Sequence, residues 1–245
     1  MKALTALWLL LRGALHLLGG WWTIRTTFGR STQAERQARV QRWAREFLRL
    51  WRIELRVHGQ PPAHGPVLLV ANHISWLDIL VLHAAGFCRF VSKAEVHHWP
   101  VVGTLATAAG TLYIERTSAR DALRVVHHMR DALVAGDVVA VFPEGTTSDG
   151  QTLLPFHANL LQAALSAAAP VQPVALTFID AATGQPSLAP MYVGDQSLLG
   201  SVWRTLTTPG LCAVVRYGQP QSPQGRGRRV WAVDLREQIA HMRGP

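Results

Sequence analysis

Lysine, cysteine and acidic side chains are all scarce in this 245-residue chain. Lysine occurs only at Lys2 and Lys93, so arginine supplies nearly all of the 24 basic residues. Cys88 and Cys212 stand in unrelated contexts, and without any Cys-x-x-Cys or Cys/His spacing the sequence offers no recognisable zinc site or disulfide framework. Charged residues are only 16% of the chain and hydrophobic residues 49%, which indicates a protein with part of its surface against an apolar phase.

The net charge of +9 is concentrated in one part of the chain. A strongly basic protein is expected to bind either nucleic acid or an anionic membrane surface. Nine arginines and three glutamates lie between Arg25 and Arg56, directly after the most apolar segment. This location favours anionic lipid, and because no nucleic-acid-binding motif is present we expect no nucleic-acid partner.

The most apolar segment runs from Ala3 to Ile24 and is interrupted by Arg12 and His16. Its length is enough to cross a bilayer, which needs about 20 residues. A central arginine costs about 3 kcal/mol on insertion scales, so we expect an anchor that lies in the interface or is shallowly inserted. A full span, a signal peptide and an ordinary buried helix are the alternatives.

The segment from Gln33 to Trp51 is predicted to be a basic amphipathic helix. Its apolar positions recur at helical spacing, at Val40, Trp43, Phe47, Leu48 and Trp51. Five arginines occupy the other faces, a combination typical of helices that bind a membrane surface. The alternative is a helix whose apolar face packs on the rest of the protein.

Short apolar strands alternate with helices after Arg52, which predicts an α/β sandwich with a mostly parallel sheet. The predicted strands lie around Ile53–Val57 and at Val67–Ala71, Phe87–Val91, Thr111–Glu115, Asp137–Phe142, Val171–Phe178 and Leu211–Tyr217. The predicted helices lie at Leu77–Ala85, Ser118–Ala135, His157–Ala168 and Arg229–Met242. The segment Ala181–Pro209 is polar and poorly periodic, and we expect it to be an excursion from the sheet.

His73 and Asp78 are the candidate catalytic pair. They lie where a predicted buried strand ends, which is where ligand sites of parallel sheets gather. At this spacing the carboxylate can bind one imidazole nitrogen, fix the tautomer and leave the other nitrogen free to accept a proton. The chain has no Gly-x-Ser-x-Gly motif, so direct transfer to a hydroxyl of the substrate is favoured over a covalent intermediate. Taken alone, such a pair is more often structural than catalytic.

Three further segments change that balance. They are Gly110-Thr-Leu-Tyr-Ile-Glu-Arg116, Val141-Phe-Pro-Glu-Gly-Thr-Thr-Ser148 and Val171-Gln-Pro-Val-Ala-Leu176. Together with Asn72-His-Ile-Ser-Trp-Leu-Asp78, they resemble in order and spacing the four sequence blocks of the glycerolipid acyltransferase family. The best-known members of that family are the 1-acylglycerol-3-phosphate acyltransferases, and the resemblance covers Arg56 to Phe178.

The resemblance implies a role for each matching residue. His73 would be the general base and Asp78 the residue that orients it. The acceptor pocket would be lined by Arg116, Glu144, Gly145 and Thr146, and the acyl-donor side by Pro173. Lys93, which follows a predicted strand, is a second candidate for the donor side. The family also implies a membrane-anchoring helix pair at residues 1–51 and an acyltransferase domain at residues 52–245.

Two positions depart from the pattern of phosphatidic-acid-forming relatives. Thr147 stands where many of them have arginine, and His157 follows Phe156 where a lysine is frequent. Because arginine and lysine are the usual phosphate-binding side chains, the loss of two cations makes an acceptor without phosphate the alternative to a phosphate-bearing one. The Thr-Thr-Ser-Asp-Gly sequence at residues 146–150, which includes the end of the third block, also resembles that of bacterial lyso-ornithine-lipid acyltransferases.

The expected activity is transfer of a fatty acyl group from acyl-CoA or acyl carrier protein to the free hydroxyl of a lysolipid. The first expected acceptor is 1-acyl-sn-glycerol-3-phosphate, with lyso-ornithine lipid as the alternative. A hydrolase and a non-catalytic lipid-binding protein are the competing classes. No metal and no cofactor beyond the thioester co-substrate are expected, since His97-His98 has no cysteine or carboxylate partner. The expected location is the bacterial inner membrane, with the active site on the cytoplasmic side.

Overall fold

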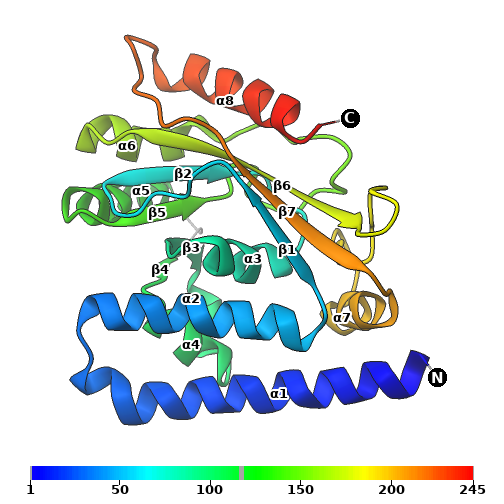
Figure 1. Cartoon of the computed structure of the whole chain (residues 1–245). Helices are drawn as coiled ribbons and strands as arrows, with labels where there is room; N and C mark the ends of the chain where they lie inside the picture. Colours follow the sequence, from blue (N-terminus) through cyan, green and yellow to red (C-terminus); the bar gives the residue numbers. More distant parts are fainter. Residues whose placement is uncertain (1, 116–118, 245) are drawn as a thin grey trace.

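A mixed seven-stranded sheet forms the centre of the computed structural model, which describes residues 2–115 and 119–244 (Figure 1). Its strands are β1 (Glu54–His58), β2 (Val67–Ala71), β3 (Arg89–Lys93), β4 (Leu112–Ile114), β5 (Val138–Val141), β6 (Val171–Asp180) and β7 (Leu211–Tyr217). Their order is β1-β7-β6-β2-β5-β3-β4. Only the β6–β7 pair is antiparallel. The central strands β2 and β5 are buried along their whole length, as expected of parallel strands covered on both faces.

Helices cover both faces of the sheet. They are α1 (Lys2–Thr27), α2 (Gln33–Leu50), α3 (Leu77–Ala85), α4 (Val102–Ala108), α5 (Ala119–Val134), α6 (Leu161–Ala167), α7 (Leu198–Thr207) and α8 (Arg228–Met242). The upper face in Figure 1 carries α5, α6 and α8, and the lower face carries α3 and α2, with α1 outermost. One hydrophobic core fills each interface between sheet and helices. The predicted sandwich with a mostly parallel sheet is confirmed.

Helix α2 begins where a capping box predicts it. The Thr32 side chain accepts from the backbone N–H of Glu35 at 3.3 Å, and the Glu35 carboxylate accepts from the backbone N–H of Thr32 at 2.8 Å. The apolar face of the helix points into the protein, because Phe47 and Leu48 are buried in the core beside α3. This corrects the expectation of an apolar face turned to the membrane: the alternative, packing on the domain, is what the structure has.

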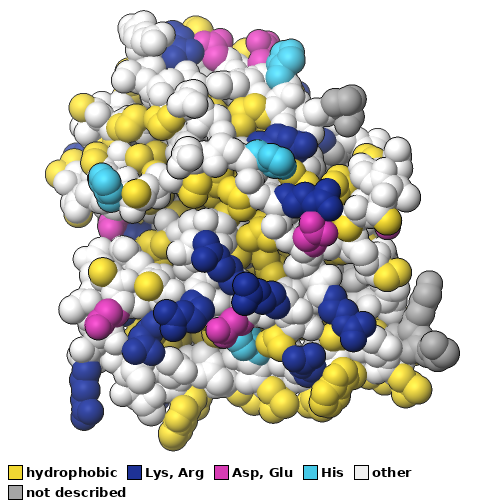
Figure 2. All heavy atoms as spheres, in the orientation of Figure 1, with side chains coloured by type: hydrophobic (Ala, Val, Ile, Leu, Met, Phe, Trp, Pro, Cys, Tyr) yellow, Lys and Arg dark blue, Asp and Glu magenta, His cyan; other side chains and the backbone are white. Residues whose placement is uncertain are grey.

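Helix α1 packs against α2 through aromatic contacts and leaves its other side open. The His16 ring stacks on Trp43 with centroids 5.0 Å apart. Eight large apolar side chains of α1 are exposed: Leu4, Leu7, Trp8, Leu10, Leu11, Leu15, Leu18 and Trp22. They form the lower edge of the molecule (Figure 2). The segment Ala3–Arg30 is long and apolar enough to cross a bilayer. Only 22% of its most apolar 18-residue stretch is buried within the protein.

The excursion between β6 and β7 contains a helix that the sequence pattern did not indicate. Helix α7 starts after Ser197, whose side chain accepts from the backbone N–H of Gly200 at 3.0 Å. Two of its buried residues, Ser201 and Thr205, are hydroxyl side chains. Because prediction rests on the period of apolar residues, a helix with hydroxyls on its inner face gives a weak signal.

Candidate active site

His73 lies in the loop between β2 and α3, and Asp78 lies in the first turn of α3. His73 Nδ1 and Asp78 Oδ2 are 2.7 Å apart. The same oxygen accepts from the backbone N–H groups of Ile74 at 2.7 Å and Ser75 at 2.9 Å. An ionised carboxylate only accepts hydrogen bonds, so Nδ1 carries the ring hydrogen and Nε2 presents a lone pair. The pairing predicted from the spacing is confirmed.

The plane of the His73 ring is set by Phe142. The two rings are stacked with centroids 4.0 Å apart and an angle of 9° between their planes. Phe142 in turn stacks on Phe90 of β3 at 5.7 Å. The side chain of His73 is 17% exposed, so the free edge of a firmly held imidazole reaches the surface. Sequence reasoning gave Phe142 no role, although it opens the Phe-Pro-Glu-Gly run.

Glu144 joins the loop after β2 to the loop after β5. Its Oε1 accepts from the backbone N–H of His73 at 2.7 Å, and its Oε2 accepts from the backbone N–H of Leu154 at 2.9 Å. The side chain is buried, and burial raises the pKa of the carboxyl, while the two N–H donors oppose that rise. A predicted contact of Glu144 with the acceptor stays a prediction. In the structure both carboxylate oxygens are held by backbone groups.

Ser148 strengthens the same junction from the other end of the third block. Its backbone N–H donates to the carbonyl of His73 at 2.8 Å, and its hydroxyl donates to the same carbonyl at 3.1 Å. Both backbone groups of His73, the N–H and the carbonyl, are therefore bound by the loop that follows β5.

Gly145 has the backbone conformation that this turn requires. Its φ is +74°, a left-handed value that L-residues adopt at a cost. A Cβ at this position would lie 3.0 Å from the ring of His157. Thr146 follows it and is exposed. Gly145 and Thr146 thus lie toward the surface of this loop, whereas the side chain of the preceding residue, Glu144, is buried.

The remaining predicted site residues are placed differently. Pro173 is buried in β6, on the face of the sheet covered by α8, where its ring packs against Gly218. His73 stacks on Phe142, which packs against the core of the opposite face, so Pro173 and the imidazole lie on different sides of the sheet. Lys93 is exposed at the end of β3, on the carboxyl edge of the sheet. Arg116 lies outside the described residues.

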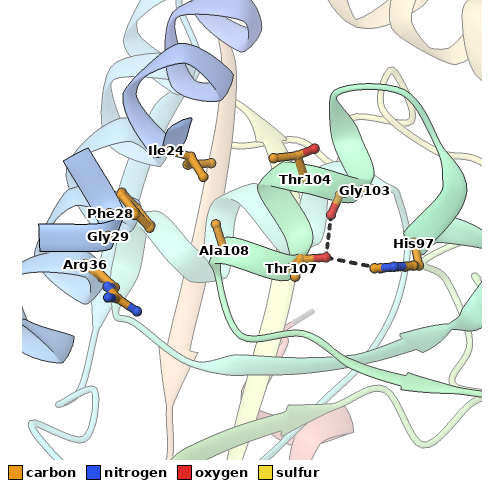
Figure 3. Close-up of a pocket in the computed structure, with 9 residues that line it drawn as sticks. All are labelled: Ile24, Phe28, Gly29, Arg36, His97, Gly103, Thr104, Thr107 and Ala108. Atoms are coloured by element: carbon orange, nitrogen blue, oxygen red, sulfur yellow. Dashed lines mark hydrogen bonds between the residues drawn. The ribbon is translucent and has the colours of Figure 1, made fainter. Parts of the chain in front are cut away.

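A shallow cavity of about 500 Å³ opens at a distance from this pair of loops. It lies where the end of α1 and the start of α2 meet α4 (Figure 3). Its lining residues are Ile24, Phe28, Gly29, Arg36, His97, Gly103, Thr104, Thr107 and Ala108. None of the predicted site residues that the structure describes lines it.

Comparison with known proteins decides the family. The sequence model of the Acyltransferase family matches residues 54–177, about half of the chain. The lyso-ornithine lipid O-acyltransferase of Pseudomonas aeruginosa is 36% identical over 223 residues, which are 91% of this chain and 85% of that protein. The chain belongs to the acyltransferase family.

Other acyltransferases of this family resemble the chain over a smaller part of its length or in fold alone. The 1-acyl-sn-glycerol-3-phosphate acyltransferase of Neisseria gonorrhoeae is 39% identical over 161 residues, 65% of this chain and 62% of that protein. The crystal structure of the 1-acyl-sn-glycerophosphate acyltransferase from Thermotoga maritima superposes with a TM-score of 0.71. It covers 100% of this chain and 99% of the other at 17% identity, so this likeness concerns the fold.

Two further side chains of this acyltransferase connect the loops around His73 to other parts of the fold. Asn72 binds β6 twice, donating to the Leu176 carbonyl at 3.0 Å and accepting from the Leu176 N–H at 2.7 Å. Thr147, which stands where a cation is frequent, donates its hydroxyl hydrogen bond to the carbonyl of Tyr192. Thr147 therefore joins the third block to the excursion that contains α7.

Proposed function

We propose that the chain transfers a fatty acyl group from a thioester donor to the free hydroxyl of a lysolipid, with His73 as the general base. The observation that carries this proposal is the His73–Asp78 pair, with Nδ1 held at 2.7 Å from a buried carboxylate and Nε2 at the accessible edge of the ring. A lipid-binding protein has no need of such a base. The family membership of the chain supports the same reaction class.

The reaction follows from this geometry in one displacement. Nε2 of His73 accepts the proton of the acceptor hydroxyl as its oxygen attacks the thioester carbonyl carbon. The new C–O bond forms, the C–S bond breaks, and the imidazolium returns its proton to the leaving thiolate. Asp78 stabilises the transient imidazolium through Nδ1–H. General-base catalysis of this kind contributes about 10²–10⁴ in rate.

Two lysolipids with different head groups are candidates for the acceptor: lyso-ornithine lipid and 1-acyl-sn-glycerol-3-phosphate. Thr147 favours lyso-ornithine lipid, because its hydroxyl is bound to the Tyr192 carbonyl and no cation stands at this position for a phosphate. The similarity to a lyso-ornithine lipid acyltransferase over 91% of the chain supports the same acceptor. The second candidate, 1-acyl-sn-glycerol-3-phosphate, is supported by the 39% identity to the Neisseria enzyme.

The proposed site of action is the cytoplasmic surface of the bacterial inner membrane, with acyl-CoA or acyl carrier protein as donor. The open, apolar side of α1 supports membrane association, since a patch of this kind on a soluble protein would be costly in water. The arginines that follow it, Arg25 and Arg30, are exposed and suit an anionic leaflet.

The test of the activity is acyl transfer by the detergent-purified full chain. Both lysolipids are supplied as acceptors, each with acyl-CoA and with acyl carrier protein thioester, and His73→Ala is run beside His127→Ala, which changes an exposed histidine of α5. We expect turnover by the parent and by His127→Ala, and a loss of about 10²–10⁴ in kcat for His73→Ala. Retained turnover in a folded His73→Ala variant would remove His73 from the mechanism.

Membrane association needs its own test. Deleting residues 1–51 would remove Phe47 and Leu48 from the core, so loss of binding would not be distinguishable from unfolding. Serine at three exposed positions of α1, Trp8, Leu11 and Leu15, leaves the core intact. We expect this triple variant to co-sediment less with phosphatidylglycerol vesicles than the parent. Equal co-sedimentation would place the anchor elsewhere.

A further inference from the structure

The outer face of α7 is apolar although it points away from the protein. Leu199, at 77% exposure, and Trp203 lie four residues apart on this face, and Leu198 is exposed beside them. The inner face of the helix is formed by Ser201, Thr205 and Leu206. A surface helix normally has the reverse arrangement, with polar residues outside.

This face continues the open side of α1. Helix α7 packs against α1 (Figure 1), and α4 packs against α1 as well. Large apolar side chains are also exposed at the first residue of α4, Val102, and just before this helix, at Trp99. Most of the large apolar residues that are exposed in the described chain therefore belong to α1 and to the two elements packed against it. Isolated exposed apolar residues are ordinary, whereas a continuous patch marks an interaction surface.

The charge of this surface suits lipid rather than a basic protein partner. Neither α1 nor α7 contains an acidic residue. The cation of α7, Arg204, is turned inward and donates to the Met191 carbonyl at 2.7 Å and to Gln196 at 2.9 Å. Tryptophan is typical of the boundary between acyl chains and head groups. Trp203 of α7 is exposed, as are Trp8 and Trp22 of α1, and all three are suited to that boundary.

The inner face of α7 is bound to the catalytic loops. Ser201 accepts a hydrogen bond from Trp76 Nε1 at 3.1 Å and donates to the Pro190 carbonyl at 3.1 Å. The segment Pro190–Tyr192 binds the catalytic loop directly: Ser75 donates its hydroxyl hydrogen bond to the Pro190 carbonyl, and the Tyr192 N–H donates to the Ile74 carbonyl at 3.2 Å. A helix with one side apolar and exposed thus holds the His73 loop with its other side.

We propose that α7 is a second lipid-contact element, whose Leu199–Trp203 face enters the surface of a phospholipid bilayer beside α1 and so holds the His73 loop next to that surface. The proposal rests on the membrane association proposed for α1. It adds that the bilayer contact extends to α7, which begins about 170 residues after the end of α1. It also adds that α7 is the element hydrogen-bonded to the segments that hold the His73 loop.

The test measures the depth of single labelled positions in vesicles. Cysteine replaces Leu199 or Trp203 in the full chain and is labelled with an environment-sensitive fluorophore. Both native cysteines are fully buried, and burial raises the pKa of the Cys88 thiol, so the new thiol is labelled selectively. Leu11→Cys on α1 is the reference. Leu123→Cys on α5, at 61% exposure, is the matched control for an exposed leucine on the other face of the sheet.

The probe is a vesicle of phosphatidylglycerol and phosphatidylethanolamine with brominated acyl chains, which quench a fluorophore only at close range. We expect quenching and a blue-shifted emission at positions 11, 199 and 203, several times stronger than at position 123. Quenching at position 11 with position 199 behaving like position 123 would overturn the proposal for α7 alone. No quenching at position 11 either would overturn both this proposal and the membrane association on which it rests.

Discussion

Glu144 accepts a hydrogen bond of 2.7 Å from the backbone N–H of His73, across 71 residues of sequence. The Glu144 carboxylate therefore binds the main chain of His73, while Asp78 binds its ring. Because the other oxygen of Glu144 binds Leu154, a single buried side chain both braces the loop after β5 and ties it to the loop after β2. We describe Glu144 as a positioning residue on this ground.

Replacing Glu144 by glutamine is expected to lower both stability and kcat. A glutamine has one carbonyl oxygen, so one of the two backbone N–H groups would face an amide donor. An unsatisfied buried donor costs about 1–3 kcal/mol. Thermal unfolding in detergent and steady-state kinetics measure the two effects. The control is Glu46→Gln at an exposed position of α2. A Glu144→Gln variant with parental Tm and kcat would show that the carboxylate does not hold the loop.

Asp78→Asn is expected to retain the fold and to lose about 10²-fold in kcat, with little change in KM. The amide oxygen can replace Oδ2 as acceptor for the backbone N–H groups of Ile74 and Ser75, so the loop keeps its shape. What disappears is the negative charge that stabilises the imidazolium. Kinetics with the exposed Asp131→Asn variant provide the control. A large rise in KM at constant kcat would instead indicate contact with substrate.

Thr147→Val is expected to weaken the junction between the third block and the α7 excursion. Valine keeps the shape of threonine but leaves the Tyr192 carbonyl without its donor. A lost hydrogen bond of this type costs about 1 kcal/mol, which lowers Tm by about 2–4 °C in a protein of this size. Thr147→Ser, which keeps the hydroxyl, should restore the parental Tm. If valine and serine behave alike, the hydroxyl does not contribute.

His83 is expected to make the protein less stable in acid. It is buried on α3 against the edge of Phe90, and burial lowers its pKa from 6.5 to about 4. The unfolded chain therefore takes up a proton before the folded protein does as the pH falls. Its contribution to stability is complete above about pH 6.5 and is lost between there and about pH 4, by up to about 1.4 kcal/mol per pH unit.

The measurement for His83 is Tm against pH, from pH 7 to pH 5, for the parent and His83→Leu. The leucine variant should show a shallower decline, because it has no group to protonate at this position. His127→Leu, at an exposed site, should keep the parental slope. Parallel curves for the parent and His83→Leu would mean that another group dominates the acid sensitivity.

The sheet and the pairing of His73 with Asp78 were predictable from sequence because both depend on short-range patterns. Strands β2 and β7 and helix α3 have the predicted bounds, since each is a compact apolar segment between turn residues. The His73–Asp78 contact needs only one loop and one helical turn, and Asp78 binds the backbone N–H groups of its near neighbours Ile74 and Ser75.

The sequence by itself determined the α/β architecture, the pairing of His73 with Asp78, and the concentration of apolar and basic residues near the N-terminus. Tertiary structure decided which apolar faces are buried. The pattern of α2 suits a membrane or a core equally, and only packing against α3 made it core. Tertiary structure also turned Glu144 inward, placed Pro173 on the far face of the sheet and set α7 between α1 and the catalytic loop. These outcomes depend on contacts between residues about 45 to 125 positions apart, which no local period or spacing encodes.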